Sequence, residues 1–336
     1  MKATPTLLSL VFSVFLVFPA MASDVAEAGS YGNLRVLQRA VEKGESLEVR
    51  DEDGSTALNN AVTFGKLKAV SFLLEHGAQI HTRDSDGSTP LHNLTVFEKK
   101  QDVDIARLLL SHGADLNARD KDGSTPLQLA VSWGRTSLAN FLLDYAQAHG
   151  IKDAHGVPLL EHKDADGSTL LHDAVSVALK RQQEMVKLLL AHGANVNAQD
   201  DDGSTPLAML TPLKSGSDIE VAKLLLEKGA DINTKDSDGD TPLHDAVMNG
   251  RDDLVSLFLK RGADVHARNH DGKTPLFWVC EIEDIRVARK IVDMLLEKGA
   301  RINARDNEGD TLGIYTNCAE DTKLMKYLYG KGLTDE

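Results

Sequence analysis

The chain is predicted to fold as an all-α repeat solenoid, and three observations carry this prediction. A phrase of the form Asp-Gly-Ser-Thr-Pro-Leu returns along most of the sequence, as at residues 86–91. Each phrase is followed by apolar residues at helical spacing. The glycines of the phrase are separated by 33, 36, 44, 36, 36, 33 and 37 residues and stand at Gly54, Gly87, Gly123, Gly167, Gly203, Gly239, Gly272 and Gly309. A period of this length is typical of stacked supersecondary units, not of one globular core.

Each unit is predicted to consist of a turn and two helices. Asp-Gly marks the turn, because Gly tolerates positive φ and Asp can bond its own backbone. Threonine can then cap a first helix, and proline at the first helical position loses no hydrogen bond. A second helix carries apolar residues such as Val221 and Leu225 and ends at a glycine such as Gly229, where a left-handed cap costs least. Such a unit cannot cover its own apolar faces, so neighbours must stack.

Two motifs then carry a family resemblance. Residues 241–246 read Thr-Pro-Leu-His-Asp-Ala, and residues 225–233 read Leu-Leu-Glu-Lys-Gly-Ala-Asp-Ile-Asn. This pattern resembles the ankyrin repeat over roughly residues 24–336. The resemblance implies paired antiparallel helices with β-hairpin fingers that bind other proteins, without chemistry of their own. His92, His172 and His244 recur at a position that bonds turn backbone in the family, so no catalytic residue is predicted.

The repeats also predict how the chain is divided. Residues 23–52 keep a second-helix pattern without Thr-Pro and are expected to form an N-terminal capping repeat, because solenoid ends need a polar outer face. The pattern decays in residues 308–336, which are expected to form a degenerate C-terminal cap. Between them, residues 53–307 are predicted to hold seven repeats, starting near residues 53, 86, 122, 166, 202, 238 and 271.

The start of the chain predicts export. Lys2 precedes an uncharged apolar run from Leu7 to Phe18, and Ala20-Met21-Ala22 is a small-residue cleavage site. We therefore expect residues 1–22 to be a signal peptide; an uncleaved anchor is disfavoured, because the run is shorter than the roughly 18 to 20 residues needed to span a bilayer. The periplasm of a Gram-negative cell is the expected location, with secretion to the exterior as the alternative.

The charge balance narrows the class of partner. Without residues 1–22 the chain would carry 36 basic and 51 acidic side chains. Binding to phosphates needs a basic face, so nucleic acid is disfavoured, and an acidic membrane surface is disfavoured too. A monomer without cofactors that binds a protein is expected.

One insertion interrupts the period. The repeat that starts near residue 122 has its additional residues within 145–163, a stretch that contains His149, His155 and His162. Imidazole and carboxylate groups suit transition metals, but the spacing matches no compact ligand motif. A solvated loop is therefore favoured over a metal site.

The two cysteines leave two alternatives. Cys280 and Cys318 fall in neighbouring columns of successive first helices, whose axes should lie about 8 to 10 Å apart. A disulfide needs Cα atoms within about 7 Å. Two buried thiols are favoured over a disulfide on this argument.

Two first-helix columns suggest where a partner binds. The position eight residues after the helix-starting threonine holds Phe64, Phe97 and Trp133 in three consecutive repeats, and Trp278 lies in the column four residues after it. In the ankyrin pattern these columns face the concave side. Aromatic rings that line an accessible groove are typical of interface hot spots. The alternative is that they only cover the ends of lengthened first helices.

The finger tips offer a second contact surface. A cation stands before most tips, but Gln199 replaces it before Asp200, Asp201 and Asp202. A basic partner would meet its strongest attraction there, and the alternative is a solvated tip.

The sequence thus predicts a non-catalytic protein–protein interaction module that binds its partner through finger tips and a concave groove and protects or inhibits an enzyme. A secreted effector that binds host proteins is one alternative. A metal-binding or enzymatic role centred on residues 145–163 is the other.

Overall fold

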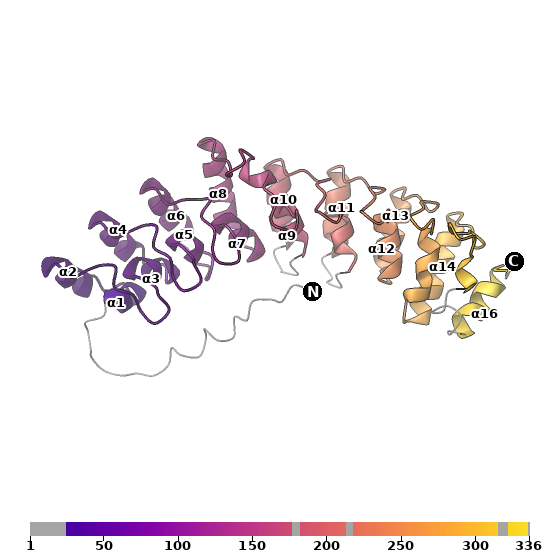
Figure 1. Cartoon of the computed structure of the whole chain (residues 1–336), viewed down its shortest axis with the longest axis horizontal. Helices are drawn as coiled ribbons and strands as arrows, with labels where there is room; N and C mark the ends of the chain where they lie inside the picture. Colours follow the sequence, from indigo (N-terminus) through magenta and orange to yellow (C-terminus); the bar gives the residue numbers. More distant parts are fainter. Residues whose placement is uncertain (1–24, 177–181, 213–217, 315–321, 335–336) are drawn as a thin grey trace. The chain divides into compact units, whose positions relative to one another are not determined.

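The structure is a computed structural model that describes residues 25–176, 182–212, 218–314 and 322–334. The expected signal peptide and Cys318 lie outside these residues. The chain forms two compact units, Met1–Ala114 and Asp115–Glu336. Within each unit, helix pairs are stacked one after another, so each is a helical repeat solenoid (Figure 1).

The first unit contains three helix pairs. Its first helices α1, α3 and α5 pack in one row, and its second helices α2, α4 and α6 pack in another. Their bounds are α1 Val25–Tyr31, α2 Leu34–Glu42, α3 Ala57–Thr63, α4 Leu67–Glu75, α5 Pro90–Asn93 and α6 Asp102–Ser111.

The second unit repeats this arrangement. One row runs through α7, α9, η2, α12, η3 and η4, and the other through α8, α10, α11, α13, α14 and α16. The first row has the bounds α7 Pro126–Ser132, α9 Leu170–Ser176, η2 Ala208–Leu210, α12 Pro242–Met248, η3 Pro275–Glu281 and η4 Leu312–Ile314. The second row has α8 Thr136–Ala148, α10 Gln182–Ala191, α11 Asp218–Glu227, α13 Asp252–Lys260, α14 Ile285–Glu297 and α16 Thr322–Gly330, and a short η1, Leu159–Glu161, lies between α8 and α9.

The first helices begin where the sequence predicts. Thr125 caps α7 by accepting from the backbone N–H of Gln128 at 3.2 Å, and Pro126 occupies the first turn. The first helices α3, α7, α9 and α12 each bury a leucine and an alanine, as Leu243 and Ala246 are buried in α12. Small and branched residues of this kind let helices pack closely, which explains the low aromatic content of 5%.

Two first helices depart from regular α-helix. The helical turn η2 stops before Pro212, because proline lacks an N–H and disfavours helical backbone in the residue before it. In η3, Phe277, Trp278 and Val279 are weak helix formers, and the segment adopts 3₁₀ geometry.

The fingers are turns in the described residues, where no β-strand forms and an isolated bridge joins Lys152 to Pro158. None of the helices in the described part of the chain is both long and apolar enough to cross a bilayer.

Candidate functional site

Each finger turn is built by one side chain, which is an aspartate in most fingers and Asn269 in one. Oδ1 of Asp200 accepts from the backbone N–H groups of Asp202, at 3.1 Å, and Ser204, at 2.8 Å. The N–H of Gly203 donates to the Asp200 carbonyl, and the glycine has φ +75°, which suits a residue without Cβ. The same bonds form around Asp84, Asp120, Asp164, Asp236 and Asp306. The first aspartate of each tip is thus committed to the turn.

The cations before the tips join neighbouring fingers through hydrogen bonds to backbone carbonyls. We call this series of bonds the finger ladder. Lys163 Nζ donates to the carbonyl of Gln199 at 2.6 Å, and Lys235 Nζ donates to that of Arg268, also at 2.6 Å. Gln199 continues this ladder without a charge, since its Nε2 donates to the carbonyl of Lys235 at 3.0 Å. Sequence reasoning treated these cations only as charges beside the tips and missed their bonds.

The acidic tip at residues 200–202 keeps two carboxylates on the surface. The Asp201 N–H donates to the Asp166 carbonyl of the preceding finger at 3.1 Å, which fixes the backbone of the tip. The side chains of Asp201 and Asp202 are exposed, whereas Asp200 is half-buried and holds the turn. Asp201 and Asp202 therefore remain candidates for contact with a partner.

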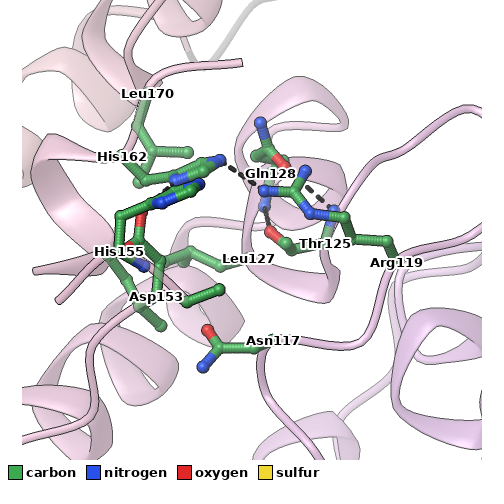
Figure 2. Close-up of a pocket in the computed structure, with 11 residues that line it drawn as sticks. Asn117, Arg119, Thr125, Leu127, Gln128, Asp153, His155, His162 and Leu170 are labelled. Atoms are coloured by element: carbon green, nitrogen blue, oxygen red, sulfur yellow. Dashed lines mark hydrogen bonds and ion pairs between the residues drawn. The ribbon is translucent and has the colours of Figure 1, made fainter. Parts of the chain in front are cut away.

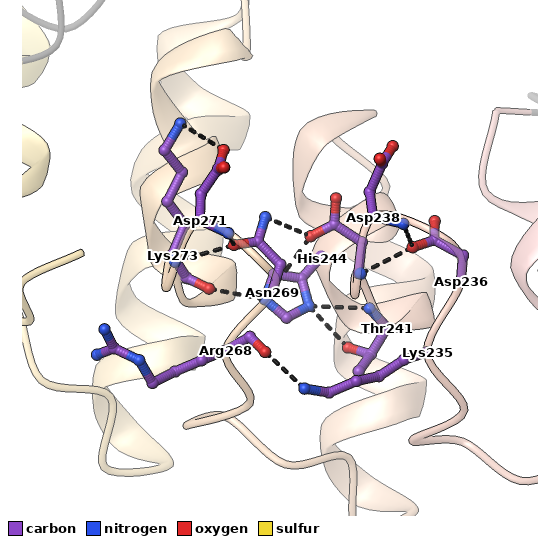
Figure 3. A network of polar contacts seen from close by, with 10 residues as sticks. Lys235, Asp236, Asp238, Thr241, His244, Arg268, Asn269, Asp271 and Lys273 are labelled. Carbon is purple, nitrogen blue, oxygen red and sulfur yellow. Dashed lines mark hydrogen bonds and ion pairs between the residues drawn. The ribbon is translucent and has the colours of Figure 1, made fainter. Parts of the chain in front are cut away.

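The recurring histidines support the turns. Nδ1 of His244 accepts from the Thr241 N–H at 3.0 Å, and its Nε2 donates to the carbonyl of Lys273 in the next repeat at 3.2 Å (Figure 3). His172 makes the same bonds to Thr169 and Ser204, and His92 bonds Thr89. Burial lowers the pKa of His244 to about 4, so the ring is neutral. The predicted structural role of this column is confirmed.

The residue four positions after the helix-starting threonine differs in side-chain type between repeats. In the first unit, Asn60 Nδ2 donates to Oδ2 of the turn residue Asp51 at 2.7 Å. In the second unit, Asp245 takes this position and faces the charges of Asp236 and Asp240. Burial, with those like charges, raises the pKa of Asp245 to about 7. Burial also raises the pKa of Asp240 to about 6, although Asn269 donates to its carboxylate at 3.0 Å.

The position eight residues after the threonine carries exposed rings. Phe64 is 41% exposed and Phe97 is 48% exposed, and their centroids lie 6.3 Å apart in a stacked arrangement. In the second unit, Trp133 is 38% exposed. Trp278, from the other column, is half-buried, with Lys273 Nζ 5.5 Å from the centre of its ring.

Sequence reasoning missed a further member of this column. Tyr31 is the last residue of α1, Phe64 is the C-cap of α3, and Tyr31 is 70% exposed. The residues Tyr31, Phe64 and Phe97 are spaced by 33 residues, so the period would have found Tyr31 if the N-terminal capping repeat had been aligned with the others. The column is therefore aromatic throughout the first unit.

The insertion contains a second copy of the finger turn. Oδ1 of Asp153 accepts from the N–H groups of His155 and Val157, and Gly156 has φ +79°, as in the other fingers. The next finger aspartate, Asp164, follows 11 residues later, which equals the excess of the 44-residue spacing over 33. The insertion is thus a duplicated finger without its helix pair.

The histidines of the insertion point to different partners. His162 lies between two finger residues, with Nδ1 2.6 Å from Oδ2 of Asp153 and Nε2 2.6 Å from Nη2 of Arg119 (Figure 2). The bond from His162 lowers the pKa of Asp153 to about 2. His149 stacks on Tyr145, whereas His155 is exposed at a small pocket lined also by Leu127. Among the described residues, no three His, Cys, Asp or Glu side chains gather in a metal-binding group.

The favoured state of the cysteines was wrong. Cys280 is disulfide-bonded, and Cys318, the other cysteine of the chain, lies outside the described residues. The expectation of two thiols assumed regular α-helices at standard axial distances. Cys280 instead lies in the 3₁₀ segment η3, where that spacing argument does not apply.

Comparisons with known proteins agree with this architecture. A family model described as ankyrin repeats (3 copies) matches residues 25–120, 83–153, 98–200, 152–236 and 213–306. A solved structure of the ankyrin repeat domain of Bcl-3, described as a unique member of the IkappaB protein family, is 30% identical. That match covers 73% of this chain and 100% of the Bcl-3 chain, with a TM-score of 0.58. No curated protein matches the chain.

Proposed function

The chain belongs to the ankyrin repeat family, and from that premise we propose that it is an exported, monomeric, non-catalytic protein that binds another protein. The partner contacts the finger tips and the first-helix columns. In the periplasm, the chain protects or restrains an enzyme by holding it. The expected signal peptide at residues 1–22 supports export.

The observation that carries this proposal is the exposed ring at the same repeat position in three repeats. Phe64, Phe97 and Trp133 are 41%, 48% and 38% exposed, whereas the leucines of the first helices, such as Leu91 and Leu127, are 1% exposed. Exposed rings at one repeat position leave apolar area in water that a partner can cover. Large aromatic side chains also dominate the energetics of protein interfaces.

The acidic tip supplies an electrostatic contribution. Asp201 and Asp202 are exposed and adjacent, and the ladder residue beside them, Gln199, is uncharged. A basic surface on the partner would be attracted there, which would raise the association rate more than the affinity.

Affinity capture from the exported fraction tests the proposal. The native chain, Phe97→Ala and Trp133→Ala serve as baits in parallel, and Tyr329→Ala is the control, because Tyr329 is 43% exposed but lies at the other end of the chain. We expect one protein to be captured by the native chain and the control, and recovered at least about fivefold less by the ring variants. Equal recovery by all four baits would mean that the rings only pack.

Cell fractionation tests the location. We expect the chain in the periplasm, cleaved after Ala22. Recovery from the medium would contradict the periplasmic role and favour action outside the cell.

A further inference from the structure

We propose that the end of the first helices in the first unit binds an extended acidic segment of the partner protein, an inference that rests on the proposed protein-binding function. The surface comprises Tyr31, Phe64 and Phe97 with the neighbouring cations Arg35, Lys66, Lys68, Lys99 and Lys100, and we call it the aromatic edge. Its rings supply apolar contact, and its cations select carboxylates.

The charge of the aromatic edge is opposite to that of the chain. The formal net charge of the whole chain is −14, but residues 31–36, 64–69 and 97–102 together contain five cations and two acids, Glu98 and the buried Asp102. Lys68 and Lys100 are exposed. No ion pair is formed by Lys66, Lys68 or Lys100 within the part of the chain that the structure describes. A local positive surface on an acidic protein favours an acidic partner segment.

The start of α4 carries a second, independent sign of this preference. Acidic residues normally stabilise the amino end of a helix, and side-chain oxygens normally cap it. Helices α6, α11 and α13 follow the rule with acids in their first turns. In α4 the N-cap is Lys66, which makes no capping bond, and the first turn holds no acid, features that the start of α8 at Arg135 shares. An external carboxylate would meet both the lysines and the uncompensated helix end.

Side-chain placement joins the cations to the rings. The aliphatic stem of Lys66 lies against Gly32, immediately after Tyr31, and the stem of Lys99 lies against Gly65, immediately after Phe64. Lys99 Nζ is 5.3 Å from the centre of the Phe97 ring. Each stem thus bridges one repeat to the one before it, which places these two lysines beside the rings of the aromatic edge.

The spacing of the rings indicates an extended segment. Same-face side chains of a β-strand repeat every two residues, or about 6.6 Å. The centroids of Phe64 and Phe97 are 6.3 Å apart. Apolar side chains at alternate positions of an extended chain would therefore match successive rings, with acidic side chains between them within reach of the lysines.

The test is a titration of the full chain with two labelled peptides of about ten residues, one alternating Leu and Asp and the other alternating Leu and Lys, followed by fluorescence anisotropy. We expect the acidic peptide to bind, the basic peptide to bind at least about tenfold more weakly, and added salt to weaken the acidic complex. No binding of the acidic peptide at about 1 mM, or equal binding of both, would overturn the proposal.

Matched variants assign the binding to the aromatic edge. We expect two double variants, Lys66→Glu with Lys68→Glu and Phe64→Ala with Phe97→Ala, each to lower the affinity for the acidic peptide at least about tenfold. Lys187→Glu reverses an exposed lysine on α10 and should leave the affinity unchanged. If either edge variant binds the acidic peptide with native affinity, the proposal is overturned. It is also overturned if the native chain binds a single-stranded oligothymidylate more tightly than it binds the acidic peptide. Circular dichroism of each variant would confirm that it folds.

The same variants separate this inference from the proposed function. If Lys66→Glu with Lys68→Glu still captures the partner as the native chain does, protein binding holds and the acidic segment is excluded. If the native chain captures nothing, the proposed function fails regardless of the peptide titration.

Discussion

The same three-residue step between helices serves different purposes in different repeats. Between α3 and α4 of the first unit it reads Phe64-Gly65-Lys66, and between α12 and α13 of the second unit it reads Asn249-Gly250-Arg251. The step Trp133-Gly134-Arg135, also in the second unit, is of the first kind, with Trp133 38% exposed. The backbone is nearly identical, since Lys66 has φ −89° and ψ 67° and Arg251 has φ −88° and ψ 74°. The side chains differ: Phe64 is exposed and Lys66 is half-buried, whereas Arg251 is 6% exposed.

The contacts of Arg251 explain its burial. Its guanidinium lies 3.3 Å from Oδ2 of the fully buried Asp218 and 3.0 Å from Oδ1 of Asp253, and it donates to the carbonyl of Leu210 at 3.1 Å. Asn249 Nδ2 donates to the Asp245 carbonyl of its own helix. The same backbone therefore lets the side chains of this step either join neighbouring repeats or remain on the surface.

Replacing the buried cation should give the largest effect on stability. We expect Arg251→Ala to lower the free energy of unfolding by roughly 3–5 kcal/mol, because it leaves Asp218 buried without its main counter-charge. Lys66→Ala at the same repeat position should change it by less than about 0.5 kcal/mol. Urea denaturation of both variants measures the difference, and equal losses would refute the contrast.

The second prediction exchanges the residues four positions after the threonine. We expect Asp245→Asn to raise the free energy of unfolding by about 1–3 kcal/mol near pH 8, because it removes a charge that faces Asp236 and provides a donor, as Asn60 does for Asp51. The reverse change, Asn60→Asp, should destabilise the chain by a similar amount. Urea midpoints at that pH measure both, and a destabilised Asp245→Asn would contradict the interpretation.

The pH dependence follows from the same groups. The pKa is raised to about 7 for Asp245 and to about 6 for Asp240. Their contribution to stability is present below pH 3.8 and is lost as the pH rises through these raised pKa values. The lowered pKa of His244, about 4, acts in the opposite sense: its contribution is present above 6.5 and lost as the pH falls. Between pH 4 and 6 both carboxyl groups lose stability while only His244 gains it, so a net fall should appear there. Asp245 alone should extend the fall as the pH rises from about 6.5 to about 7. Asp245→Asn should flatten that fall, which urea midpoints across the range would measure.

The smallest effect on stability is expected at the finger ladder. Lys163→Ala removes one exposed bond to the Gln199 carbonyl, and we expect a loss of about 0.5–1 kcal/mol. Lys163→Gln should recover part of it, since Gln199 itself makes the equivalent bond to Lys235. A Lys163→Gln variant no more stable than Lys163→Ala would show that the ladder depends on charge.

The repeated residues predicted most of the fold, because each has a local conformational preference that can be recognised from the sequence. Thr125 caps a helix, Pro126 starts it, and Gly203 allows the finger turn, so period and turn chemistry together give the helix pairs. The irregular first helices could not be predicted in the same way. The disulfide state of Cys280 depends on the 3₁₀ geometry of η3, which the repeat pattern does not reveal.

The candidate site could be predicted only in part. Phe64 and Phe97 were found from their column, but the stem of Lys99 against Gly65 depends on side chains from different repeats and follows from no single motif. The duplicated finger at Asp153 was readable from its Asp-x-x-Gly pattern, yet its link through His162 to Arg119 required coordinates.

Hydrogen exchange of the native chain, alone and with its captured partner, tests most directly whether the step between helices is the docking surface in the first unit. We expect slowed exchange of the amides of residues 31–36, 64–69 and 97–101 on binding. We expect unchanged exchange at residues 249–251, where Arg251 is buried. Unchanged exchange throughout the three first-unit segments, with a captured partner present, would contradict this expectation.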